Sequence, residues 1–77
     1  MRLKKQYRDN LVGVIRNSPL DRKDLREGLE VLVAYGLYGD EEYCSYGDPT
    51  SFVQAHAEVI MPIVDDLFFR AAKAGAR

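Results

Sequence analysis

Residues 29–38 are Leu-Glu-Val-Leu-Val-Ala-Tyr-Gly-Leu-Tyr, and this stretch decides the fold class. From Leu29 onward the helical pattern loses its polar face, and a helix that is apolar all round is buried on every side. A short buried strand is the competing interpretation, because Val31, Val33 and Tyr35 favour strands. We favour the helix, and with it an all-α protein.

The segment before this stretch carries the signals of a helix start. Ser18 can cap the helix and Pro19 suits its first position. The helix should therefore open there and end at Gly36 or Gly39. Gly28 lies inside it and costs roughly 1 kcal/mol relative to alanine, so we expect Gly28 to allow the close approach of another helix.

An earlier helix is expected over residues 2–17, because apolar side chains recur there every three or four positions. Asn17 and the Ser18-Pro19 pair that follows should end it. The apolar stripe consists of Leu3, Tyr7, Leu11, Val14 and Ile15.

The last segment, residues 50–74, has a helical apolar stripe that a proline interrupts. Ser51 and Gln54 have the spacing of a capping box at its start. Pro62 removes a helical hydrogen bond and clashes with the preceding turn, so we expect a kink or a break near Met61. The segments together predict a small bundle of three to four helices.

Residues 39–49 form the main predicted loop, because glycines lie near both of its ends and Asp48-Pro49 closes it. A short hairpin around 42–46 is a second interpretation of this loop.

Composition excludes several classes of protein. The 77 residues predict a single helical domain, 1–77. One cysteine and one histidine cannot form an internal disulfide or a four-ligand zinc site of their own, so we expect no metal and no cofactor. The longest apolar stretch, 31–35, is too short to span a bilayer. A lone thiol suits a reducing compartment, and we expect a cytoplasmic protein without a membrane partner.

Charge is divided along the chain, although the net charge is only −1. Residues 1–27 hold eight Lys or Arg and four Asp or Glu, whereas residues 28–66 hold eight acidic residues and no basic one. Residues 67–77 hold three basic residues and no acidic one. Either the basic first helix neutralises the acidic middle in the fold, or an acidic face docks on a positive partner.

The sharpest local feature is an acidic loop rich in tyrosine. Tyrosine buries a large area at low entropic cost and is favoured in binding surfaces, and carboxylates beside it can hold arginines of a partner in forked pairs. The alternative is a solvated loop whose tyrosines fold back onto the core. The predicted partner-binding residues are Tyr38, Asp40, Glu41, Glu42, Tyr43, Tyr46 and Asp48.

These features predict a non-catalytic binding protein that masks a basic, nucleic-acid-binding surface of another protein. In size and surface character the chain resembles phage anti-CRISPR proteins and nuclease immunity proteins, a resemblance that covers no motif and transfers no residue. No nucleophile motif surrounds Cys44 or His56, so we do not expect an enzyme. His56 lies on or beside the apolar stripe of the last segment, where a packed histidine is expected.

Two alternatives use other parts of the chain. A nucleic-acid-binding regulator would use the basic start, Arg2, Lys4, Lys5 and Arg8. A helix-turn-helix is disfavoured, because 29–38 lacks the basic or amide side chains of a recognition helix. An assembly protein would use an apolar seam, most simply in a homodimer. The predicted seam residues are Leu32, Tyr35, Phe68 and Phe69.

Overall fold

The computed structural model describes residues 2–44 and 48–75, with their side chains except those of residues 40–44 and 75. Over this part of the chain it has four helices and no strand. The all-α prediction is therefore confirmed, and residues 29–38 are helical. The helices are α1 (Lys5–Asn17), α2 (Arg22–Cys44), α3 (Pro49–Ala55) and α4 (Ala57–Gly75).

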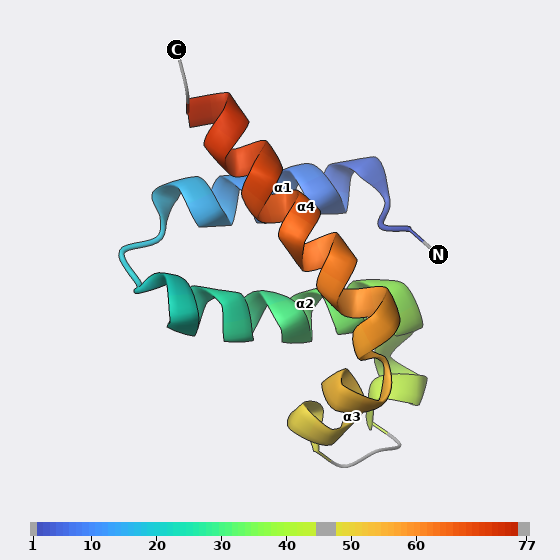
Figure 1. Cartoon of the computed structure of the whole chain (residues 1–77). Helices are drawn as coiled ribbons and strands as arrows, with labels where there is room; N and C mark the ends of the chain where they lie inside the picture. The colour runs from blue at the N-terminus through green and yellow to red at the C-terminus, as the bar shows by residue number, and fades with distance from the viewer. Residues whose placement is uncertain (1, 45–47, 76–77) are drawn as a thin grey trace.

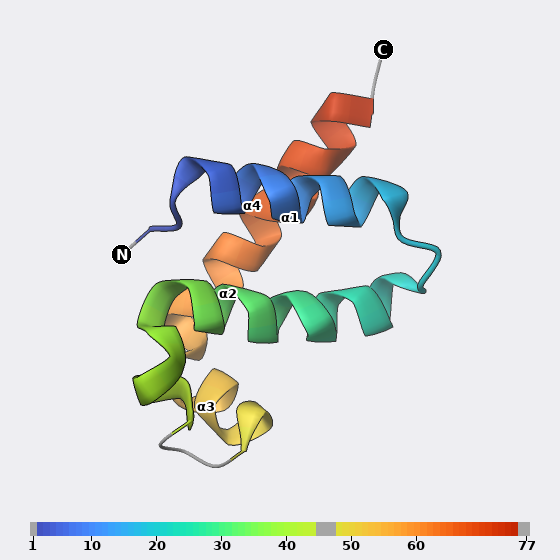
Figure 2. The same cartoon turned by 180° about the vertical axis from the view of Figure 1, so that it is seen from behind.

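The helices are arranged as a stack of three with a fourth laid across it. Figure 1 shows α1, α2 and α3 one below another, with α4 crossing α1 and α2 in front, and the view from behind in Figure 2 shows the same order. The helix α4 starts beside α3 and then packs against both α2 and α1. It therefore connects the α3 end of the molecule with the α1 end.

The core forms where the apolar stripes of α2 and α4 meet. Its largest fully buried side chains are Leu29, Val33, Phe52, Ile60, Val64 and Leu67. Those of α2 and of α4 recur at helical spacings, which is why each of these two helices buries one face, and Phe52 is added from α3. The expected burial of α2 on every side is wrong, because Leu32 and Tyr35 keep 40% and 44% of their surface exposed.

The start of α2 lies later than its sequence signals indicate. The Ser18 hydroxyl accepts a hydrogen bond from the Leu20 amide at 3.2 Å, a local turn that competes with helix formation. The carbonyl of Asp21 accepts the first bond of the helix, from the Leu25 amide at 2.9 Å. The helix therefore begins at Arg22 and not at Pro19.

The far end of α2 extends into the predicted 39–49 loop. Gly39 interrupts the helix with φ 80° and ψ 176°, after which helical backbone resumes and ends at Cys44. Glycine is essentially the only residue that adopts this conformation without strain. The loop prediction is thus wrong for 40–44, and the hairpin around 42–46 is not confirmed. Residues 45–47 lie outside the described residues.

The last predicted helix divides in two, at His56 and not at Pro62. The backbone of His56 has φ −118° and ψ 22°, and its ring nitrogen Nδ1 lies 2.9 Å from the Phe52 carbonyl oxygen. Pro62 lies inside α4, and the helix continues past it to Gly75. The expected kink at Pro62 is not confirmed.

The contact between α1 and α2 depends on Gly36. A Cβ at this position would lie 2.5 Å from Cε2 of Tyr7 and 3.0 Å from Cδ2 of Leu3. The Tyr7 hydroxyl donates a hydrogen bond of 2.6 Å to the Leu32 carbonyl, which holds the ring there. Gly28 was predicted to have this role, but a Cβ at Gly28 would meet no atom within 4 Å, so that expectation is wrong.

Candidate partner-binding surfaces

Tyr38, the first of the predicted partner-binding residues, packs against the helix core. Its ring meets that of Phe52 edge-on at 5.2 Å and lies 4.6 Å from the ring of His56. Phe52 and His56 are themselves stacked at 4.2 Å. Tyr38 is half-buried by these contacts, so most of its ring supports the fold and only part of it is open to a partner.

Asp48 is exposed and caps α3. Its carboxylate accepts hydrogen bonds from the Thr50 amide at 3.2 Å and from the Ser51 hydroxyl at 2.9 Å. Pro49 occupies the first helical position, which suits a residue without an amide hydrogen. The predicted cap, Ser51, is instead a partner of the true cap.

The remaining predicted contact residues of this loop, 40–43 and 46, are placed only in part. The backbone of Asp40, Glu41, Glu42 and Tyr43 lies in the helical turn that follows Gly39, and their side chains lie outside the described residues. Tyr46 lies outside them altogether. This turn and α3 form the end of the molecule farthest from α1 in Figures 1 and 2.

In the fold, Arg26 and Arg70 join the basic segments to the acidic segment 28–66, whereas α1 does not. Among the described side chains, no cation of α1 pairs with an acidic residue of 28–66. The acidic residues of this segment that do pair take Arg26 of α2 or Arg70 of α4, so the first helix does not neutralise the described part of the acidic middle. The ion pairs are Arg26–Glu30 (3.6 Å), Arg26–Asp65 (2.8 Å), Arg70–Asp66 (2.6 Å) and Arg8–Asp9 (3.4 Å).

An acidic groove of about 650 Å³ lies between α2 and α3, in a place that the sequence did not indicate. Its carboxylates are Asp24, Glu27 and Glu30 of α2, and its apolar lining includes Val31, Val53 and Met61. Asp24 and Glu27 are exposed, and neither has an ion-pair partner in the described part of the chain. We call this surface the acidic groove.

The spacing of the groove residues along α2 was the available signal. Positions 24, 27, 28 and 31 recur every three or four residues and therefore share one face of the helix. This face has two carboxylates beside an apolar residue. In the sequence, such a pattern is typical of the edge of an ordinary solvent-exposed helix face. Only the packing of α3 against it makes a groove.

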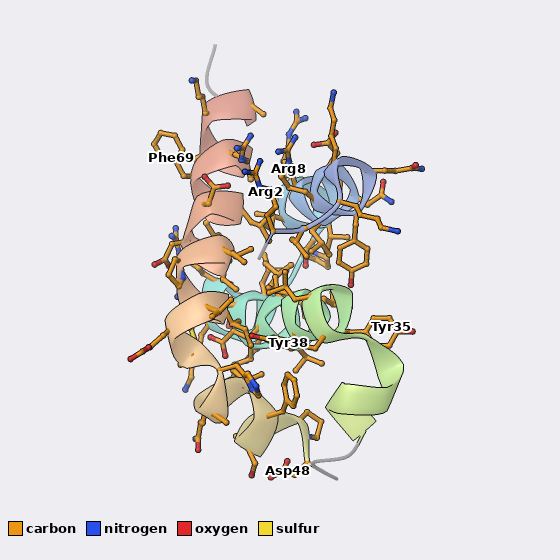
Figure 3. The ribbon with its side chains drawn as sticks, turned by 90° about the vertical axis from the view of Figure 1, so that its right-hand side faces the viewer. Arg2, Arg8, Tyr35, Tyr38, Asp48 and Phe69 are labelled. Atoms are coloured by element: carbon orange, nitrogen blue, oxygen red, sulfur yellow. The ribbon has the colours of Figure 1, made fainter. Side chains whose placement is uncertain are left out.

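The predicted apolar seam is divided between the core and two opposite surfaces. Phe68 is buried, with the Arg22 guanidinium 4.7 Å above its ring. Phe69, which is 66% exposed, and Tyr35 point away on opposite sides of the molecule (Figure 3). Leu32 lies on α2 near Tyr35. The four seam residues therefore do not form one surface.

The basic start of the chain is brought together with the end of α4. Arg2 and Arg8 lie between α1 and α4 in Figure 3, and Arg70 shares a cleft with them. Lys4 and Lys5 are exposed beside this cleft without lining it.

Comparison of the chain with models of protein families, with curated proteins and with solved structures finds no match. Over the described residues there is no group of three or more metal-ligating side chains, and no helix is long and apolar enough to cross a membrane. The surfaces described above therefore carry the functional argument.

Proposed function

We propose that this protein is a non-catalytic binding module whose acidic end covers a cationic surface on another protein. The acidic end comprises the acidic groove, the helical turn 40–44 and Asp48. The observation that carries the proposal is that Asp24 and Glu27 of the groove have no ion-pair partner within the described residues and lie beside an apolar lining.

Such a groove suits a partner segment that combines arginine or lysine with apolar side chains. Val31, Val53 and Met61 provide contact area for the apolar part, and methionine adapts to irregular surfaces. Asp24 and Glu27 can accept forked hydrogen bonds from guanidinium groups. Cationic surfaces of this composition are those that bind nucleic-acid phosphates, so the proposed activity is the masking of a nucleic-acid-binding surface.

The histidine supports a non-catalytic role. His56 is the single histidine of the chain, and its ring is stacked against Phe52 and hydrogen-bonded to a backbone carbonyl. A general base must reach a substrate proton, and this ring is instead packed against Phe52 of α3 and Tyr38 of α2.

The test uses charge reversal at the acidic end. The partner is first captured from the native host on the immobilised protein and identified, and its affinity is then measured with purified components. The variant Asp24→Lys/Glu27→Lys alters the groove, and Asp40→Lys/Glu41→Lys/Glu42→Lys alters the turn. The control Asp9→Lys/Asp21→Lys makes the same change of charge as the groove variant, on exposed residues outside the acidic end.

We expect the groove and turn variants to weaken the complex about tenfold or more, and salt to weaken the wild-type complex. The control should bind nearly as well as the wild type. Gly28→Leu adds an uncharged side chain at the groove and should also weaken the complex. Equal losses in the control and the groove variant, in folded proteins, would contradict the proposal.

A further inference from the structure

At the opposite end of the molecule, α1 and α4 enclose a cleft of about 310 Å³ that is rimmed by arginines. Arg2 precedes α1, Arg8 lies in α1, and Arg70 lies in the second half of α4. The neighbouring buried side chains Leu3 and Leu67, with the half-buried Ile63, give the cleft an apolar floor. We call this feature the arginine cleft.

Positive charge in the arginine cleft is only partly compensated. Asp66 is the one carboxylate among the described residues that line it, so three guanidinium groups and one carboxylate leave two net positive charges. Asp66 contacts Nε of Arg70 at 2.6 Å, and Arg8 lies 3.4 Å from Asp9 beside the cleft. Arg2 has no ion-pair partner within the described part of the chain.

Three like charges around one cleft repel one another, and only Arg70 pairs with a carboxylate that lines the cleft. Arg70 keeps its terminal amino groups available, since its ion pair with Asp66 uses Nε. The arrangement is therefore that of a site for an anion with several acceptor oxygens.

We propose that the arginine cleft binds the phosphomonoester group of a nucleotide, with the sugar and base lying on the apolar floor. A phosphomonoester carries a charge of about −1.5 to −2 and three acceptor oxygens, which matches the net charge of the cleft. Guanidinium groups bind phosphate oxygens in forked pairs and stack on the faces of bases.

The size and charge of the cleft favour a nucleotide over an acidic peptide. A volume of about 310 Å³ is at the lower limit of ligand-binding cavities, which hold one small molecule. A single side-chain carboxylate carries one negative charge, which would offset only one of the two net positive charges of the residues that line the cleft. The nucleotide is free in solution or is the phosphorylated end of a strand, because both present the same chemical group.

The test measures the binding of adenosine 5′-monophosphate by isothermal titration calorimetry, with adenosine as the ligand that lacks phosphate. The variants are Arg2→Gln, Arg8→Gln and Arg70→Gln, each checked for folding by circular dichroism. Arg2 lies outside the helices, so Arg2→Gln tests the cleft even where another variant unfolds. Arg16→Gln is the matched control, because Arg16 is an exposed arginine of α1 that does not line the cleft.

We expect each cleft variant to weaken nucleotide binding about tenfold to a hundredfold, and the control about twofold or less. Adenosine should bind far more weakly than its monophosphate. A short single strand with a 5′-phosphate is compared with the same strand ending in a hydroxyl. Preference for the phosphorylated strand over the mononucleotide assigns the cleft to strand ends, and the reverse preference assigns it to free nucleotides.

The proposal is overturned by any of three results with folded protein. These are the absence of measurable nucleotide binding, equal loss of affinity in Arg16→Gln and the cleft variants, and strand binding that does not depend on the terminal phosphate. The acidic end plays no part in this test, so its outcome is independent of that of the proposed protein-masking function.

Discussion

The same substitution at two glycines of α2 should have opposite effects on stability. Gly28 and Gly36 both lie in the helix interior, where alanine is more favourable than glycine by about 1 kcal/mol. A Cβ at Gly28 meets no atom within 4 Å, so Gly28→Ala should realise this gain in full. A Cβ at Gly36 would instead lie 2.5 Å from the ring of Tyr7.

The cost at Gly36 follows from how the Tyr7 ring is held. Introducing a methyl group into a packed contact costs about 1–3 kcal/mol. Moving the ring away also breaks the hydrogen bond from Tyr7 to the Leu32 carbonyl, which is worth about 0.5–1.5 kcal/mol. After the helical gain is subtracted, Gly36→Ala should lower the free energy of unfolding by about 0.5–3.5 kcal/mol.

Thermal and urea unfolding followed by circular dichroism measure the two variants. In a domain of this size about 1 kcal/mol shifts the melting temperature by about 4–8 °C, so Gly28→Ala should melt above the wild type and Gly36→Ala below it. In a Tyr7→Ala background the ring is absent, and Gly36→Ala should become stabilising. A Gly36→Ala variant as stable as Gly28→Ala would refute the proposed close approach of α1.

Three further outcomes follow from the structure, each measurable by the same unfolding experiments. Phe68→Ala should lower the free energy of unfolding by about 3–5 kcal/mol, because this ring is only 8% exposed. Phe69→Ala, at a ring that is 66% exposed, should change it by about 0.5 kcal/mol or less. Similar effects of the two substitutions would contradict this difference in burial. Gly39→Ala should cost about 1–3 kcal/mol, since φ is 80° and ψ is 176° there, and an unchanged melting temperature would contradict that conformation. Burial, with a smaller effect of Tyr35, raises the pKa of the Tyr7 hydroxyl. Its stabilising contribution is therefore complete below the unfolded value, about pH 10, and is lost as pH rises through the folded pKa. The stability difference between wild type and Tyr7→Phe should shrink as pH rises above about 10; a constant difference would contradict the assignment.

Sequence patterns predicted the helices but not all of their ends, and competing signals explain the differences. Both Asp48 and Ser51 are good caps, and Asp48 prevails because Pro49 suits the first helical position after it. The division at His56 had no strong local signal. The ring of Tyr38, which lies 4.6 Å from that of His56, belongs to a different helix, so no local pattern shows this contact.

The candidate site was predictable only where it depends on charge along the chain. The excess of carboxylates in 28–66 is visible in the sequence, and none of the described ones forms an ion pair with a cation of α1. The acidic groove requires α3 to pack on Asp24 and Glu27, and the arginine cleft requires Arg70 to meet the start of the chain. Those contacts join residues far apart in sequence, so no local pattern indicates them.

In this chain of 77 residues the cations of α1 can stay unpaired with the acidic segment 28–66, because pairing them would add little to stability. An exposed ion pair contributes about 1 kcal/mol at most, so the cations of α1 lose little by leaving the acidic segment unneutralised. The helices α1 and α3 are separated by α2 (Figures 1 and 2), two interhelical spacings of about 8–10 Å each. The Debye length at physiological salt is about 8 Å, so each end presents its own potential with little cancellation by the other. Weak surface pairing and screening together allow one small helical fold to offer an acidic surface and a basic surface to different ligands.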